Sequence, residues 1–268
     1  MTENLVKQII EQLTTLDLQS EPIEDIYWNI LKMHGILPII ITTINPGTII
    51  IRGRNYNNKE NFSLVKSHSY PPAECVKDYG RANIPKSNMF YGSINPIDDD
   101  GPIARITILT EIGKTYRSQA DKETIVYSSW EVINPLNVIT ICSSHLYKSL
   151  NPRMVALREE FCHRYSTHPG FKLIELLGNE FAKKVDNNYE YMITGIFSDI
   201  VCGCKTYDGI YYPGVQSDGA GMNIALKPES VNRCLNFLRA CEVDFIRKGL
   251  NIVEERHRDI KIKDFKID

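Results

Sequence analysis

A block of predicted helices in the middle of the chain constrains the fold more than any other feature of the sequence. Apolar residues recur at helical spacing over 153–165, 171–185 and 189–201. Segments with β-strand character stand on both sides of this block: 48–54, 89–93, 123–133, 136–142, 210–212 and 223–226. The tail over about 237–263 alternates well enough for a closing hairpin. Strand groups separated by a helical insert indicate an α+β fold.

The beginning of the chain is predicted to form a separate helical part. Apolar spacing predicts one helix over 5–16 and a second over 23–33. The sequence therefore predicts an N-terminal helical appendage over 1–45 and a main domain over 46–268. Packing against the main domain is the favoured role of the appendage, and a partner-binding face is the alternative.

Charge and hydropathy argue against two classes of partner. The net charge is −2, so the chain has no general electrostatic attraction to nucleic acid or to an anionic membrane. Its longest apolar run, Ile36 to Ile41, is far too short to span a membrane. Thr2, Glu3 and Asn4 stand where a signal peptide would be basic. We expect a cytoplasmic protein that binds neither nucleic acid nor membrane.

The cysteines predict neither disulfides nor metal. There are seven, and an odd number argues against a disulfide framework. Cys202-Gly203-Cys204 has a short metal-like spacing, but a zinc site usually adds a second Cys/His pair, and none lies nearby. We expect reduced structural thiols and no metal.

A long loop-like segment over 55–87 is the first candidate for function, because long irregular segments in compact domains usually serve it. Within it Arg81 follows Gly80, and an arginine fork binds phosphate bidentately. Asn83 and Tyr91 follow closely. This combination suits a ligand that is anionic at one end and flat at the other, such as a nucleotide.

Arg52 and Arg54 end the strand before this loop and point to the same face because they are two residues apart. They extend the candidate anion site. From pattern alone, surface ion pairs for the arginines and core packing for the aromatic residues are somewhat favoured over a binding site.

Glu111 lies inside an otherwise apolar helical run, 106–112. Burying even a neutral polar group costs roughly 2–7 kcal/mol, so a buried carboxylate usually serves a function or an ion pair. The alternative is that Glu111 faces water beside Arg105 or Arg117. Before other observations the two interpretations are equal.

A Gly-rich polar loop between two predicted strands, over 208–226, is the third candidate. It would present main-chain N–H groups together with Tyr212, Gln216 and Ser217. The segment does not match a dinucleotide-binding glycine motif opening a helix, and the sequence contains no GxSxG, HExxH or P-loop. Taken alone, the segment is an ordinary turn.

In order and spacing these clusters resemble the RES family, named for its arginine, glutamate and serine. The resemblance covers roughly residues 48–230, and four motifs in register carry it. They are Ile51-Arg52-Gly53-Arg54, then Gly80-Arg81-Ala82-Asn83-Ile84-Pro85 leading to Met89-Phe90-Tyr91-Gly92, then Ile103 to Glu111, and Gly209-Ile210-Tyr211-Tyr212-Pro213 running to Gly221-Met222-Asn223-Ile224-Ala225-Leu226.

The resemblance implies a core like that of ADP-ribosyltransferase toxins, made of short β-sheets. It implies that NAD is a substrate rather than a cofactor and is degraded by cleavage of the nicotinamide–ribose bond, with water or inorganic phosphate as acceptor. It also implies a bacterial toxin silenced by a partner antitoxin protein that covers the active site.

The same resemblance implies roles for individual residues. Arg52 and Arg81 would bind the NAD phosphates, Tyr91 would stack on nicotinamide or ribose, and Glu111 would stabilise the cationic ribose or orient the acceptor. The rest of the predicted NAD-binding set is Arg54, Asn83, Tyr212, Gln216 and Ser217.

One position departs from the family pattern, because Gly214 stands where the family serine usually follows the Tyr-Pro pair. Ser217 is the candidate replacement. If it does not replace that serine, weaker or altered activity, or a non-catalytic NAD- or nucleotide-binding module, is the alternative. An ADP-ribosyltransferase that modifies a macromolecule is the other alternative.

Overall fold

The computed structural model describes residues 2–20, 22–95 and 102–267. Within them the strands are β1 (Ile40–Ile44), β2 (Ile49–Asn55), β3 (Phe90–Ile94), β4 (Lys122–Val132), β5 (Leu136–Thr140), β6 (Gly209–Pro213), β7 (Met222–Leu226), β8 (Leu235–Lys248) and β9 (Asn251–Asp259). They form a nine-stranded sheet in the order β1-β5-β6-β7-β3-β2-β4-β8-β9. Only the β5–β6 pair among these is parallel. The α+β prediction is confirmed.

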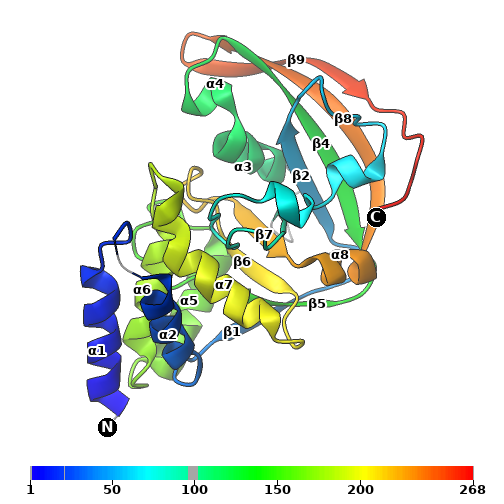
Figure 1. The fold of residues 1–268 in the computed structure, drawn as a ribbon. Coiled ribbons are helices and arrows are strands. Elements are labelled where there is room, and N and C mark those ends of the chain that lie inside the picture. The colour runs from blue at the N-terminus through cyan, green and yellow to red at the C-terminus, as the bar shows by residue number, and fades with distance from the viewer. Residues whose placement is uncertain (1, 21, 96–101, 268) are drawn as a thin grey trace.

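The helices gather mainly around the end of the sheet that contains β1, while two of them lie near β2 and β4 (Figure 1). They are α1 (Thr2–Thr15), α2 (Ile23–His34), α3 (Ile103–Ile112), α4 (Lys114–Arg117), α5 (Pro152–Tyr165), α6 (Phe171–Ala182), α7 (Met192–Gly203) and α8 (Pro228–Cys234). Short 3-10 turns are η1 (Val65–His68), η2 (Ala73–Cys75) and η3 (Asn188–Tyr191). Among the described residues, no helix is both long and apolar enough to cross a membrane.

The sheet divides into two halves where β2 meets β3. Only Ile50 and Ile51 of β2 pair with β3, whereas β2 pairs with β4 along its whole length. Figure 1 shows β2, β4, β8 and β9 in one half, with β5, β6 and β7 in the other. Beyond their short ladder β2 and β3 diverge, which opens the sheet on the face that α3 covers.

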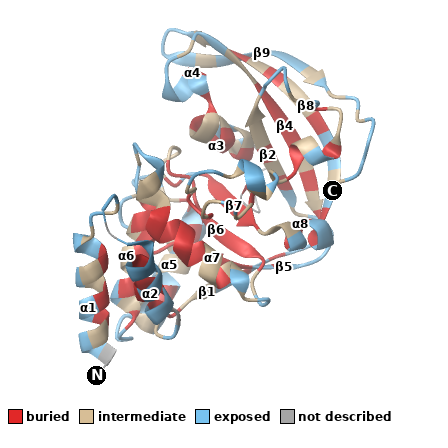
Figure 2. Ribbon diagram, viewed as in Figure 1, coloured by how far each residue is buried: buried red, intermediate tan, exposed pale blue. Residues whose placement is uncertain are grey.

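The N-terminal helices share a core with the helical insert. One side of α1 and one side of α2 are buried with apolar residues of α6 and α7 (Figure 2). The strand β1 lies within the segment predicted as an appendage but pairs with β5. The sheet therefore crosses the predicted boundary at residue 45.

Helix α3 packs closely against the main chain of β2 and of the segment just before β7. A Cβ atom on Gly53 of β2 would collide with Ile108, and one on Gly221 would collide with Thr107. Because both positions are glycine, the helix can approach β2 and β7 closely. This close approach brings Glu111, near the end of α3, to the place where the two halves of the sheet separate.

Most predicted elements are present, and their ends are corrected by a few residues. Helix α6 stops at Ala182 rather than at 185, because Lys183 is extended. The predicted helix over 189–201 is the turn η3 followed by α7. The sequence patterns did not predict β1, α4 or α8. The last two are short, and α4 begins where Glu123 accepts hydrogen bonds from the N–H groups of Lys114 and Thr115, a tertiary contact.

Candidate functional site

A cleft of about 210 Å³ opens between α3 and the divergent ends of β2 and β3. Its wall on the far side comes from β6, β7 and the turn η3. Five of the residues predicted for the site line it: Arg81, Tyr91, Glu111, Tyr212 and Gln216. These residues are up to 135 positions apart in the sequence. The fold brings them together on one surface.

Glu111 is half-buried and faces this cleft. Its Oε1 atom accepts hydrogen bonds from the main-chain N–H of Gln216 at 3.2 Å and from Nδ2 of Asn223 at 3.3 Å. Both donors are neutral, so they orient the carboxylate without cancelling its charge. Arg117 donates to the main-chain oxygen of Glu111 at 3.1 Å, and Arg105 pairs instead with Glu254.

Arg81 is buried on the opposite wall, where neutral groups hold its guanidinium. Its Nη atoms donate to the carbonyl oxygens of Phe181 at 2.5 Å and Lys183 at 3.1 Å, and to the Tyr191 hydroxyl at 3.3 Å. The guanidinium also lies 4.8 Å from the centre of the Tyr191 ring. Arg81 belongs to no ion pair among the described residues. A fixed cation without a carboxylate partner suits an anionic ligand.

The Tyr91 hydroxyl organises the loop that carries Arg81. It donates to Oδ1 of Asn83 at 2.7 Å and accepts from the N–H of Ala82 at 3.0 Å. Burial raises the pKa of Tyr91 well above its ordinary value, so the hydroxyl stays protonated. The amide of Asn83 donates to the carbonyl oxygens of Asp78 and Ile84. Asn83 therefore shapes the loop and does not line the cleft.

Arg52 and Arg54 share a face of β2, as predicted, but that face points away from the cleft. Side chains alternate along a strand, so Gly53 between them is the residue that lines the cleft. Arg52 donates to the main-chain oxygen of Tyr91 at 2.7 Å and lies over the Phe90 ring. Burial lowers its pKa, with a smaller contribution from the charge of Arg54. The structure does not bring these two arginines into the cleft.

Arg54 is engaged within the loop that follows β2. Its Nη1 atom pairs with the carboxylate of Glu60 and donates to the carbonyl oxygen of Ser67. Its guanidinium also lies over the Phe62 ring. These contacts hold the loop against the sheet. Arg54 therefore forms an ion pair, the alternative to a binding role that its sequence position left open.

Ser217 lies next to Gly214, the position at which the resemblance leads us to expect a serine. Its hydroxyl donates to the main-chain oxygen of Gly214 at 3.2 Å and accepts from the N–H of Gly221 at 3.3 Å. A Cβ atom on Gly214 would lie 2.5 Å from that hydroxyl and 3.4 Å from Oε1 of Glu111. Ser217 thus fills the space that a side chain on residue 214 would need, beside the carboxylate.

Three polar side chains that line the cleft were not predicted from the sequence as site residues: Arg117, Tyr191 and Asn223. Asn223 carried a signal, since it is the polar residue in the otherwise apolar, fully buried strand β7. Arg117 was considered only as a partner for Glu111. Tyr191 gave no signal, because its place depends on the turn that leads into α7.

Among the described residues, no three His, Cys, Asp or Glu side chains gather as a metal site. A comparison of the sequence with protein-family models found no match, and a comparison with curated proteins found none either.

Proposed function

We propose that this protein degrades NAD by cleaving the bond between nicotinamide and ribose. The observation that carries the proposal is the pairing of two fixed charges across one cleft. The Glu111 carboxylate is oriented by Gln216 and Asn223, and the Arg81 guanidinium is held by carbonyl groups. NAD presents a pyrophosphate for the cation and a ribose that becomes cationic for the carboxylate. The RES resemblance supports the same assignment.

The chemistry follows from those charges. As the C1′–N bond breaks, its electron pair leaves with nicotinamide, and the ribose acquires oxocarbenium character. Glu111 stabilises that positive charge, because its carboxylate is oriented before the reaction begins. Water or inorganic phosphate then forms the new C1′–O bond, and the proton of the attacking group is released.

The size of the cleft fits one end of the substrate. Its volume of about 210 Å³ is below the roughly 300–1,000 Å³ of pockets that enclose a whole drug-sized ligand. We place nicotinamide and its ribose in the cleft, against the rings of Tyr91 and Tyr212, with the pyrophosphate towards Arg81. The adenosine end lies over the open mouth.

Purified protein incubated with NAD, with and without phosphate, tests the proposal. Free nicotinamide with ADP-ribose indicates hydrolysis, and nicotinamide with ADP-ribose 1″-phosphate indicates phosphorolysis. Intact NAD under both conditions would contradict the proposal. Adding cell extract and labelled NAD separates it from macromolecular transfer, where the label would appear on protein or nucleic acid.

The toxin role has its own test. We propose that loss of NAD stops growth when the chain is expressed in bacteria, and that a partner antitoxin prevents it. Induction of the wild-type chain is expected to arrest growth and lower cellular NAD, while induction of Glu111→Gln at equal protein level does neither. Growth arrest without loss of NAD would reject this role.

A further inference from the structure

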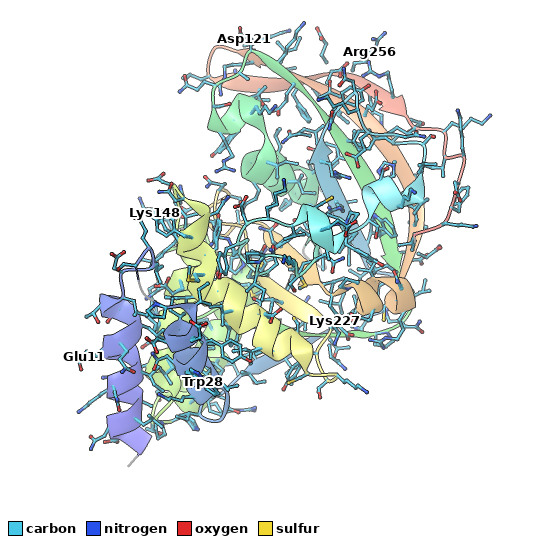
Figure 3. All side chains as sticks on the ribbon, viewed as in Figure 1. Glu11, Trp28, Asp121, Lys148, Lys227 and Arg256 are labelled. Carbon is cyan, nitrogen blue, oxygen red and sulfur yellow. The ribbon has the colours of Figure 1, made fainter. Side chains whose placement is uncertain are left out.

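The two edges of the sheet differ in their chemistry. β9 carries a run of charged side chains, and Figure 3 shows Arg256 at that outer margin. β1, at the other edge, has the uncharged sequence Ile-Ile-Thr-Thr-Ile over residues 40–44. Charges on an edge strand oppose pairing with another chain, whereas an uncharged β-branched edge favours it. β1 is therefore the edge able to accept a further strand.

The outer side of β1 has main-chain groups ready for such pairing. Across the described residues, every main-chain partner of β1 comes from β5 on its inner side. Thr42 and Thr43 direct their hydroxyls to Thr140 and Asn137 of β5, at 2.6 Å and 3.0 Å. These two hydroxyls therefore do not compete for the outward-facing N–H and C=O groups of β1. The Ile41 side chain on the same strand is 50% exposed.

A groove of about 230 Å³ runs beside this edge, between β1 and α5. Its apolar lining comes from Ile41 of β1, from Ile39 just before this strand, and from Leu157 and Phe161 of α5. Two charged residues of α5 also border it, one acidic and one basic. They are Glu160 and Arg164, which are 3.7 Å apart and largely exposed.

We propose that two copies of this chain associate about a two-fold axis by antiparallel pairing of their β1 strands. Such an axis stands perpendicular to the sheet and brings the two α5 helices to the same face, running in opposite directions. Glu160 of each copy then faces Arg164 of the other, and Ile41 of each enters the groove of the other. The order acidic-then-basic along α5 is complementary to itself under this rotation. That self-complementarity identifies the occupant as a second copy.

The charge pattern gives a test by reversal. Glu160→Arg leaves two positive charges at the interface of each copy, and Arg164→Glu leaves two negative ones. Either variant alone is expected to weaken self-association about tenfold or more, because both ion pairs become repulsions. An equimolar mixture of the two variants is expected to associate again, since opposite charges then face each other.

Sedimentation equilibrium of the full chain measures this directly. The wild type is expected at twice the 30.7 kDa mass of one chain, and each variant alone shifts towards the single-chain mass. Glu255→Arg on β9 is the matched control and keeps the wild-type association. A wild type of single-chain mass at all concentrations overturns the proposal. So does a mixture that stays as dissociated as its components, or loss of association in the β9 control. Circular dichroism of each variant confirms folding.

Discussion

The hydroxyl of Ser217 lies 2.5 Å from the point where a Cβ atom on Gly214 would stand. The same point is 2.9 Å from the Cγ2 atom of Thr107 on α3. The main chain of residue 214 is thus enclosed between a helix and a hydroxyl. A serine placed there needs both neighbours to move.

We therefore predict that Gly214→Ser destabilises the protein, by about 1–3 kcal/mol, the usual range for overpacking. Urea unfolding followed by circular dichroism measures the free energy. Adding Ser217→Ala removes one of the two collisions, so the double variant should be more stable than the sum of the single effects. Simple additivity would show that the two residues do not compete for space.

Replacing Arg81 by lysine tests the shape of the cation. Lysine keeps the charge but lacks the planar fork that reaches Phe181, Lys183 and Tyr191 together. We expect Arg81→Lys to lower kcat/KM for NAD by about tenfold to a hundredfold, with the fold intact. Lys205→Arg, an exposed exchange of the same two residue types, is the control. Wild-type kinetics for Arg81→Lys would remove Arg81 from the binding site.

Tyr91 combines a ring in the cleft with a hydroxyl in the loop. Tyr91→Phe keeps the ring and removes the bonds to Asn83 and Ala82, leaving the N–H of Ala82 without its partner. We predict a loss of stability of about 1–3 kcal/mol, measured by urea unfolding. Activity of the folded fraction should persist, because the ring still lines the cleft. An inactive but fully stable variant would instead give the hydroxyl a role in the reaction.

His68 gives the stability a pH dependence. Burial lowers its pKa below the ordinary 6.5, while its ring bonds to the carbonyl oxygen of Phe62, and the charges of Arg54 and Arg52 lower the pKa further. The unfolded chain then binds more protons at this histidine than the folded one. The contribution of His68 to the free energy of unfolding is therefore fully present above pH 6.5 and falls as the pH drops below it. In His68→Gln this part of the decline should vanish. The difference between the two urea-midpoint curves from pH 7 to 5 measures it, and parallel curves would contradict the assignment.

Local pattern was enough to predict most of the fold. The helical insert, the strands around it and the closing hairpin are recognisable because apolar spacing and turn residues agree locally. β1 was missed because its sequence, Ile-Ile-Thr-Thr-Ile, does not alternate between apolar and polar residues. The division of the sheet at β2 and β3 depends on contacts between distant segments, which spacing along one chain does not encode.

The site was only partly predictable for a related reason. Arg81 and Glu111 reach one cleft because Gly53 and Gly221 let α3 approach the sheet. Arg52 was correctly placed on one face with Arg54, but the sequence does not show which face of β2 the cleft occupies. Alternation along a strand fixes relative direction, and packing decides the rest.

The charge of Glu111 is the centre of the proposed reaction, and its removal is the most direct test. In Glu111→Gln the side-chain oxygen can still accept from Gln216 and Asn223, so the fold is retained while the negative charge is lost. Glu11→Gln, on the exposed face of α1, is the matched control (Figure 3). The measurement is the rate of nicotinamide release from NAD by each purified, folded variant. We predict a loss of about 10²–10³ for Glu111→Gln and none for Glu11→Gln. Nicotinamide release at the wild-type rate by Glu111→Gln would contradict the proposed role of this carboxylate.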